Sequence, residues 1–204
     1  MQLPIICLVT GGGSPRELVS LIREAAIAGV DLVQIREPAL DDRSLVALTR
    51  EAIAETRGTG CRIVVNDRLD VALASGAAGV HLRAESFAER RVRTLAPGGF
   101  LIGRSVHDVP QAEAAARAGC SYLIFGTVFP SRNKPADHPI AGLVDLREVC
   151  RSVQVPVIAI GGISVENAEQ AFSAGARGVA AIDLFRGGEP LSGIVPTLRR
   201  RFDT

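Results

Sequence analysis

The chain has 204 residues with a formal net charge of +1, and 47% of them are hydrophobic. This composition is typical of a soluble globular protein and argues against a disordered chain. The near-zero net charge gives no electrostatic reason to expect nucleic acid or an acidic membrane surface as a partner. No apolar run approaches the roughly 20 residues that a membrane-spanning helix needs. The N-terminus also lacks the basic segment and apolar core of a signal peptide.

The cysteines predict neither a disulfide framework nor a zinc site, because none of them has C-x-x-C spacing. They are scattered along the chain, at Cys7, Cys61, Cys120 and Cys150. A reducing cytoplasm is therefore the expected location.

Eight short apolar runs, bounded by polar or turn residues, predict eight strands. Continuous apolar runs are typical of buried parallel strands, since helices cover both faces of such a sheet. In chain order, the predicted strands are Ile5–Thr10, Leu32–Glu37, Arg62–Asp67, Gly79–Arg83, Phe100–Val106, Tyr122–Val128, Val157–Gly161 and Gly178–Phe185.

The segments between these strands predict helices, several of which have recognisable starts. Ser14–Glu17 is a capping box with proline at the first helical position, and Asp108–Gln111 is a similar start. Asp41, Ser44 and Ser164 are candidate caps of further helices.

A small residue followed by glycine recurs just before a predicted strand, where glycine supplies the left-handed conformation that ends a helix. The glycines of this pattern are 47, 43 and 56 residues apart, at Gly29, Gly76, Gly119 and Gly175. One strand–helix unit is shorter than these intervals, so each is expected to hold two units. The alternation predicts a single-domain (β/α)8 TIM barrel over residues 1–204, with a doubly wound open sheet as the alternative.

Polar side chains follow several predicted strands, at the end of a barrel where catalytic groups gather. They are Thr10, Gln34, Arg36, Glu37, Asn66, Asp67, His81, Arg83, Ser105, His107 and, in the loop after the sixth strand, Lys134. His107 is the leading acid/base candidate, because imidazole exchanges protons near neutral pH. Ser105 precedes it on the same face of the strand; a loop histidine bonded to a backbone carbonyl is the alternative interpretation. His81, in mid-strand, is expected to be buried and hydrogen-bonded.

The run Gly161–Ser164 after the seventh strand predicts a phosphate site. Paired glycines let backbone amides approach a ligand, and a following helix offers free N–H groups. A plain tight turn is the alternative. Asp183, at the end of the eighth strand, is expected near the same phosphate, where it either caps the last helix, binds a cation or repels the anion.

Asn66 and Asp67 follow the third strand and are a candidate Mg²⁺ site, since Mg²⁺ takes one or two carboxylates together with phosphate oxygens. The alternative is a structural carboxylate, with Asp67 paired to Arg36 or Arg68.

At these residues the chain resembles the thiamine phosphate synthase superfamily, whose fold is a TIM barrel. The supporting motifs are V-Q-I-R-E (Val33–Glu37), V-N-D-R-L-D-V-A-L (Val65–Leu73), G-V-H-L (Gly79–Leu82) and V-I-A-I-G-G-I (Val157–Ile163). One branch comprises synthases that join a pyrimidine pyrophosphate to a thiazole phosphate with Mg²⁺. The other comprises TenI-type thiazole tautomerases, which aromatise a thiazole carboxylate phosphate by a proton shift without a metal.

Two positions depart from the synthase pattern that the resemblance implies. Pro38 stands where synthases have a pyrophosphate-binding lysine, and Ser86 stands where they have a magnesium-binding aspartate, with Glu85 adjacent. Asp183 also replaces a serine that is usual in both branches.

The run Gly103–His107 followed by Leu123–Phe129 resembles the tautomerase branch, whereas Pro130–Lys134 resembles the synthase pyrophosphate loop. In the tautomerase branch the histidine matching His107 is the proposed acid/base. The function predicted from the sequence is therefore a thiazole tautomerase of thiamine biosynthesis that needs no cofactor.

In this prediction His107 moves the proton, while Ser105 and Arg36 orient the substrate carboxylate. The other predicted substrate-binding or phosphate-binding residues are Gln34, Asn66, Lys134, Gly161, Gly162 and Asp183. A Mg²⁺-dependent synthase, with Asp67 as main metal ligand and Glu85 in support, is the first alternative. A non-catalytic barrel that binds thiamine precursors is the second. The resemblance also implies a homodimer, and the expected small-molecule partner is a phosphorylated thiazole.

Overall fold

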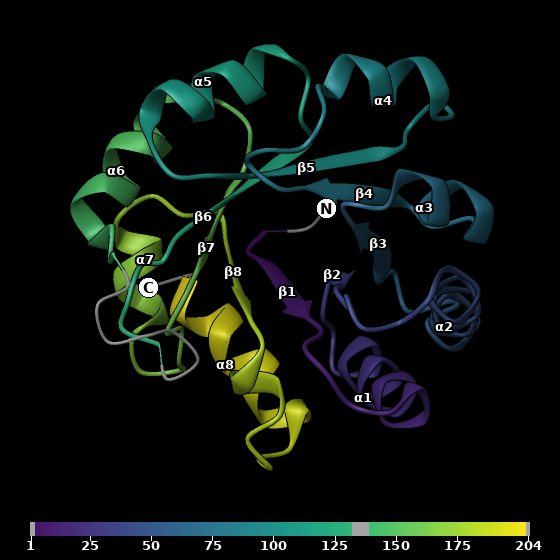
Figure 1. Cartoon of the computed structure of the whole chain (residues 1–204). Helices are drawn as coiled ribbons and strands as arrows, with labels where there is room; N and C mark the ends of the chain where they lie inside the picture. The colour runs from purple at the N-terminus through teal and green to yellow at the C-terminus, as the bar shows by residue number, and fades with distance from the viewer. Residues whose placement is uncertain (1–2, 132–138, 203–204) are drawn as a thin grey trace.

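A computed structural model describes residues 3–131 and 139–202. Its parallel strands close into a barrel in chain order, with β1 hydrogen-bonded to both β2 and β8 (Figure 1). The strands are β1 Ile5–Val9, β2 Leu32–Ile35, β3 Arg62–Asn66, β4 Gly79–Leu82, β5 Leu101–Val106, β6 Tyr122–Phe125, β7 Val157–Ile160 and β8 Gly178–Ala181. This closure confirms the predicted TIM barrel and excludes the open sheet.

Helices surround the barrel, and each connects one strand to the next or follows the last strand (Figure 1). They are α1 Pro15–Ile27, α2 Asp42–Glu55, α3 Leu69–Ser75, α4 Glu89–Leu95, α5 Val109–Arg117, α6 Gly142–Ser152, α7 Ala168–Ser173 and α8 Leu191–Phe202, with a short 3-10 helix η1 at Asp183–Phe185. None of the described helices is long and apolar enough to cross a membrane.

Three of the predicted helix starts are confirmed by their capping contacts. Ser14 and Glu17 form the reciprocal capping box of α1, and the carboxylates of Asp41 and Asp108 accept from backbone N–H groups of α2 and α5. Ser44 is not a cap, because its own N–H is the group that Asp41 accepts from.

The recurring glycines have the predicted left-handed backbone. Their φ angles are 98° at Gly29, 78° at Gly76, 87° at Gly119 and 104° at Gly175. Each follows a helix and leads into the next strand, so the repeat in the sequence corresponds to pairs of strand–helix units.

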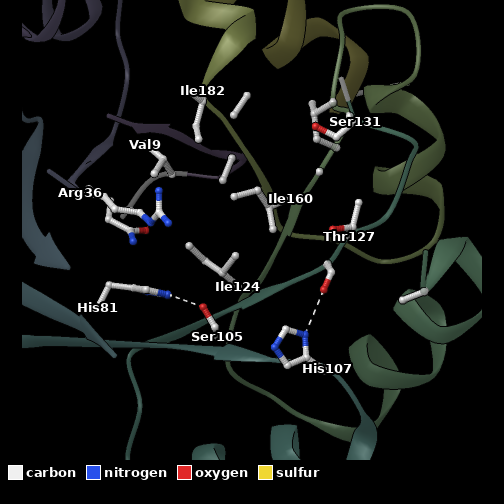
Figure 2. Close-up of a pocket in the computed structure, with 18 of the residues that line it drawn as sticks. Val9, Arg36, His81, Ser105, His107, Ile124, Thr127, Ser131, Ile160 and Ile182 are labelled. Carbon is white, nitrogen blue, oxygen red and sulfur yellow. Dashed lines mark hydrogen bonds between the residues drawn. The ribbon is translucent and has the colours of Figure 1, made fainter. Parts of the chain in front are cut away.

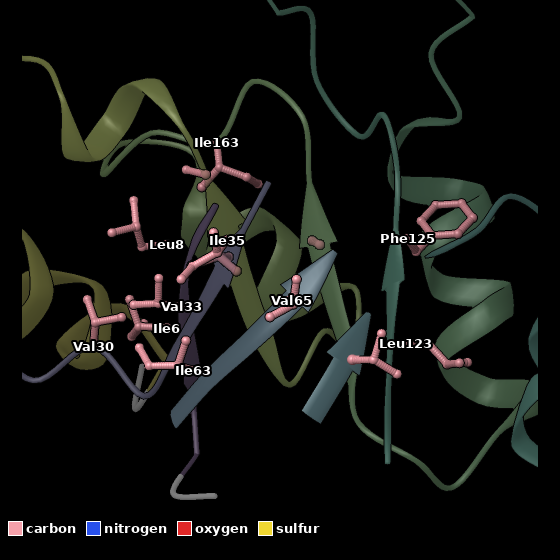
Figure 3. Packing of buried hydrophobic residues seen from close by; sticks show 14 of the residues in the cluster. Ile6, Leu8, Val30, Val33, Ile35, Ile63, Val65, Leu123, Phe125 and Ile163 are labelled. Atoms are coloured by element: carbon pink, nitrogen blue, oxygen red, sulfur yellow. The ribbon is translucent and has the colours of Figure 1, made fainter. Parts of the chain in front are cut away.

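Alternation along the strands divides the apolar residues into two cores. Residues such as Ile6, Leu8 and Val33 point outward and pack against the helices, as Figure 3 shows. Their neighbours along the strands fill the barrel interior, where the buried cluster is Ile5, Cys7, Val9, Leu32, Val64, Tyr122, Ile124, Ile158 and Ala180. This interior core fills the barrel between the strands.

Most strands are shorter at their carboxyl ends than the sequence predicts. Arg36, Asp67 and Arg83 lie just past β2, β3 and β4, because the backbone there turns outward into loops. The largest difference is at β8, which ends at Ala181, so Asp183 begins η1 and is not part of the strand. These groups therefore stand on the rim of the barrel.

The described cysteines are all free, as their spacing predicts. Burial raises the pKa of the Cys61 and Cys120 thiols to about 12 and that of Cys150 to about 11. They are therefore protonated thiols near neutral pH, which are poor nucleophiles and poor metal ligands.

Candidate active site

A cavity of about 1050 Å³ opens at the carboxyl ends of the strands. Figure 2 shows Arg36 and His81 on one side of it and Thr127 and Ser131 on the opposite side. Apolar side chains lie between the two sides, namely Val9, Ile124, Ile160 and Ile182. The cavity thus has two polar ends joined by an apolar floor.

The predicted site residues converge on this cavity. Those that line it are Gln34, Arg36, Asn66, Ser105, His107, Gly161, Gly162 and Asp183. Lys134, like His138, lies outside the described residues. We call the end formed by Gln34, Arg36, Asn66 and Arg83 the cationic end, and the end formed by Gly161, Gly162 and Ile163 the glycine end.

His81 lies in the barrel interior and is buried, as predicted. Its Nε2 lies 2.9 Å from the Ser105 hydroxyl, and its ring stacks on Tyr122 with centroids 5.7 Å apart. Burial lowers the pKa of His81 from 6.5 to about 3, with a smaller opposing effect of the Asp67 charge. A neutral imidazole is therefore held on the cavity floor at all physiological pH values.

His107 follows β5 and is exposed to the cavity. Its Nδ1 lies 3.1 Å from the Gly126 carbonyl oxygen, which can only accept, so Nδ1 must carry the proton of the neutral ring. Nε2 is then the unprotonated nitrogen, which is the form that a general base needs. The sequence analysis treated a backbone-carbonyl contact of His107 and an acid/base role of His107 as alternatives. They are compatible, because the contact uses Nδ1 and leaves Nε2 for proton transfer.

Gln34 and Asn66 form a pair across the ends of β2 and β3. The Gln34 side-chain N–H donates to Asn66 Oδ1 at 2.9 Å, which leaves the buried Gln34 Oε1 without a partner among the described residues. An unpaired buried acceptor is costly. A ligand N–H donor in the cavity would satisfy it, which supports the prediction that both amides bind substrate.

Asp67 has a left-handed backbone, with a φ of 58°, which is unusual for a residue other than glycine. Its Oδ2 accepts from Arg83 Nε at 2.7 Å and lies 2.6 Å from Arg83 Nη2. Its Oδ1 accepts from the Ser86 hydroxyl. Asp67 is thus paired, as the structural alternative proposed, but with Arg83; Arg68 instead pairs with Asp42 and Asp70.

These contacts do not fit a Mg²⁺ site at Asp67. Both carboxylate oxygens already accept hydrogen bonds, and a guanidinium cation stands where a divalent cation would have to bind. No group of three or more His, Cys, Asp or Glu side chains among the described residues has metal-binding geometry. Ser86 completes this arrangement: the sequence marks it as a departure from the synthase pattern, but its contact with Asp67 is seen only in the structure.

The glycine end depends on backbone conformations that only glycine adopts readily. The φ angles are 99° at Gly161 and 62° at Gly162, and a Cβ at Gly162 would lie 2.7 Å from the Phe129 carbonyl oxygen. The loop after β7 therefore packs directly on the loop after β6. The N–H groups of Gly162 and Ile163 make no hydrogen bond to a described residue. They are available to an anion.

The predicted helix amides at this end are not in place. α7 begins only at Ala168, after a turn that Ser164 and Asn167 hold together. The Ser164 hydroxyl accepts from the Asn167 N–H at 3.4 Å, and Asn167 Oδ1 accepts from the Ser164 N–H at 2.8 Å, so Ser164 caps this turn and is not the N-cap of α7. Asp183 lines the same cavity, but it does not cap the last helix, because α8 begins at Leu191. The anion site of the glycine end therefore consists of loop amides.

Fold and cavity together define a (β/α)8-barrel protein with a two-ended polar site at the carboxyl ends of its strands. Residues 6–185 match the family model described as thiamine monophosphate synthase. The chain belongs to this family.

Relatives extend the match over the whole chain. A thiamine-phosphate synthase of Methanoregula boonei is 37% identical over 205 aligned residues, which cover 100% of this chain and 95% of the relative. One of Methanocella arvoryzae is 41% identical, with coverages of 86% and 84%. A solved thiamine phosphate pyrophosphorylase of Pyrococcus furiosus superposes with a TM-score of 0.84 at 32% identity, over 98% of this chain and 96% of the other.

Proposed function

We propose that this protein is an enzyme of thiamine biosynthesis and acts as a thiamine-phosphate synthase. The reaction joins a pyrimidine pyrophosphate to a thiazole phosphate and releases pyrophosphate. The observation that carries the proposal is the two-ended cavity, because a two-substrate reaction with two anionic groups needs two separate anion sites around one apolar floor. The name shared by the relatives supports the synthase over the tautomerase that the sequence motifs favour.

In this proposal the thiazole phosphate binds at the glycine end, through the free amides of Gly162 and Ile163. The pyrimidine pyrophosphate binds at the cationic end, with its ring near Gln34 and Asn66. The apolar floor then brings the two rings together and excludes water from the reacting atoms.

The thiazole ring nitrogen gives its electron pair to a new bond with the methylene carbon of the pyrimidine, while the bond from that carbon to pyrophosphate oxygen breaks. The electron pair of the broken bond leaves on the oxygen, so negative charge grows at the cationic end. Arg36 lies at that end, and its side chain makes no hydrogen bond or ion pair to another described residue. Its guanidinium would stabilise the departing pyrophosphate.

The resemblance implies Mg²⁺ for a synthase, but the Asp67 contacts do not fit the metal. We therefore assign no step of the reaction to a metal ion.

The tautomerase is a second candidate, and the geometry of His107 favours it. In the neutral ring of His107 the contact with Gly126 leaves Nε2 unprotonated, and His107 lines the same cavity as Ser105, which is what removal and return of a ring proton requires. The Ser105 hydroxyl is shared with the neutral His81, so it is oriented but not ionised. Pro38 and Ser86, the departures from the synthase pattern, also favour this candidate.

One pair of assays separates the candidates. Purified protein is given both synthase substrates and pyrophosphate release is measured; separately, it is given the thiazole carboxylate phosphate tautomer and aromatisation is followed. We expect pyrophosphate release that requires both substrates.

If the protein aromatises the tautomer but releases no pyrophosphate, and if His107→Ala lowers the aromatisation rate about 10²–10⁴-fold, the protein is a tautomerase and not a synthase. Tight binding of thiazole phosphate with neither reaction would leave a non-catalytic binding protein. Homodimerisation and a cytoplasmic location stay predictions; light scattering of the purified protein tests the first.

A further inference from the structure

We propose that the cationic end binds a diphosphate directly through the guanidinium groups of Arg83 and Arg36, with no metal ion between protein and anion. Arg83 takes the place of the divalent cation, and Asp67 and Ser86 hold it there. The proposed function is needed only to identify the natural ligand, which would be a pyrimidine diphosphate ester; binding of a diphosphate is inferred from the site itself.

The barrel brings these groups to one place. Arg36, Asp67 and Arg83 follow β2, β3 and β4, which are consecutive neighbours in the sheet. Adjacent strands are about 4.8 Å apart, so the two arginines start about 10 Å from each other with the carboxylate between them. Both arginines line the same cavity. Their long side chains can therefore converge on one anion.

Arg83 is fixed by a closed set of contacts. Two of its donor nitrogens, Nε and Nη2, face Asp67. Its backbone N–H donates to the Ser86 hydroxyl at 3.0 Å, its carbonyl accepts from the Ser86 N–H at 3.1 Å, and that hydroxyl in turn donates to Asp67. The loop conformation, the carboxylate and the guanidinium therefore hold one another in place.

The guanidinium retains donors for a ligand after these contacts. A guanidinium has five N–H groups, and the pairing with Asp67 engages one edge of the plane. The Arg83 side chain is 63% exposed, and the Arg36 side chain has no hydrogen-bond or ion-pair partner among the described residues. Two guanidinium groups with free N–H donors fit phosphate oxygens better than ammonium groups do, because they bind two oxygens at once.

Charge at this end also favours an anion over a metal. The carboxylate of Asp67 is neutralised by Arg83, and Arg36 adds a positive charge that forms no ion pair with a described residue. A Mg²⁺ ion at Asp67 would have to displace the guanidinium or bind beside it, against the repulsion between two cations. Glu85 lines the cavity as well, but it is exposed and thus screened by water.

The test is calorimetric titration of the whole protein with sodium pyrophosphate, once with EDTA and once with excess Mg²⁺. The variants are Arg83→Ala, Asp67→Asn and, as a matched control, Arg117→Ala, which removes an exposed arginine paired to Glu113 on α5. Thermal unfolding of each variant shows whether it is folded. Because binding is measured without turnover, the result does not depend on which reaction the enzyme catalyses.

We expect binding in EDTA that weakens at least about tenfold in Arg83→Ala and is unchanged in the control. Asp67→Asn should bind within about threefold of wild type, because it removes a negative charge while keeping an acceptor for Arg83. Binding that requires Mg²⁺ and is lost in Asp67→Asn would overturn the proposal, as would no binding in either buffer.

Discussion

The two ends of the cavity offer anion sites of different construction. At the glycine end the donors are backbone N–H groups, and their positions are set by φ angles and by packing of one loop on another. At the cationic end the donors are the side chains of Arg36 and Arg83, which follow β2 and β4, and Arg83 is oriented by a carboxylate and a hydroxyl. A backbone site is rigid and uncharged, so it selects by shape. A side-chain site carries charge, so it selects by charge.

This difference suits a reaction in which one phosphate stays bound and the other group leaves. The rigid end is suited to hold the thiazole phosphate in place while the bond forms. The charged end is suited to stabilise charge that develops only as pyrophosphate departs. The apolar floor separates the two ends, and the ligand-binding predictions below test that separation.

The largest effect is expected from Gly162→Ala. Its Cβ would meet the carbonyl oxygens of Phe129 and Pro130, and its φ of 62° is unfavourable for alanine. The loop must shift, so thiazole phosphate binding should weaken by about 100-fold, measured by titration calorimetry. Gly58→Ala is the matched control, because its φ of 84° is similar but no atom lies within 4 Å of the added carbon. Equal affinity in both variants would mean that the glycine end does not bind the phosphate.

Arg36→Ala should act on the other end alone. We expect pyrophosphate binding to weaken about tenfold, because one unpaired charge and its donors are lost. Thiazole phosphate binding by the same variant serves as the internal control and should stay within about twofold. If both affinities fell together, the two ends would not be separate sites.

His81, on the same side of the cavity as Arg36, should make stability depend on pH. The folded protein keeps His81 neutral because burial lowers its pKa to about 3, whereas the unfolded chain takes up a proton below about 6.5. Stability from this group is therefore complete at neutral pH and falls as the pH drops from about 6.5 toward about 3. The expected loss from this residue is about 1 kcal/mol between pH 7 and pH 5.5.

The measurement is denaturant unfolding of wild type and His81→Gln at several pH values between 5 and 8. The stability difference between them should shrink as the pH falls. A constant difference would show that His81 is not held neutral by the barrel interior.

The smallest effect is that of salt. Raising the ionic strength should weaken pyrophosphate binding several-fold, because the guanidinium groups are exposed and their field is screened over about 10 Å at 0.1 M and about 3 Å at 1 M. Thiazole phosphate binding should respond less, since backbone amides carry no net charge. Titrations at two salt concentrations test this, and an equal response of the two ligands would contradict the contrast between the ends.

Much of the fold could be predicted from local patterns. The apolar runs located all eight strands. Gly29, Gly76, Gly119 and Gly175 marked the end of every second helix, because glycine readily adopts the left-handed conformation that ends a helix, and their spacing indicated two strand–helix units per interval. The convergence of Arg36, Ser105, His107 and Gly162 on one cavity followed from the rule that strand ends meet at one face of a barrel. The exact strand ends were not predictable, since an apolar run does not show where hydrogen bonding to its neighbour stops.

The contacts within the site needed the three-dimensional structure. The sequence offered Arg36 or Arg68 as partners of Asp67, and the actual partner is Arg83, one strand further along. It also placed helix amides directly after Gly162, whereas α7 begins at Ala168. Both differences concern the direction of a loop, which depends on packing between strands distant in sequence.

By itself, the sequence determined the order of the elements, the closed barrel and the residue types at its open end. These follow from the periodicity of side chains and from the special conformations of glycine, which act over a few residues. Only the tertiary structure decided that Arg83 forms an ion pair with Asp67 and that the cavity has two ends. It also decided that Nδ1 of the neutral His107 ring donates to the Gly126 carbonyl oxygen. Those facts depend on distances between strands, which no local pattern encodes.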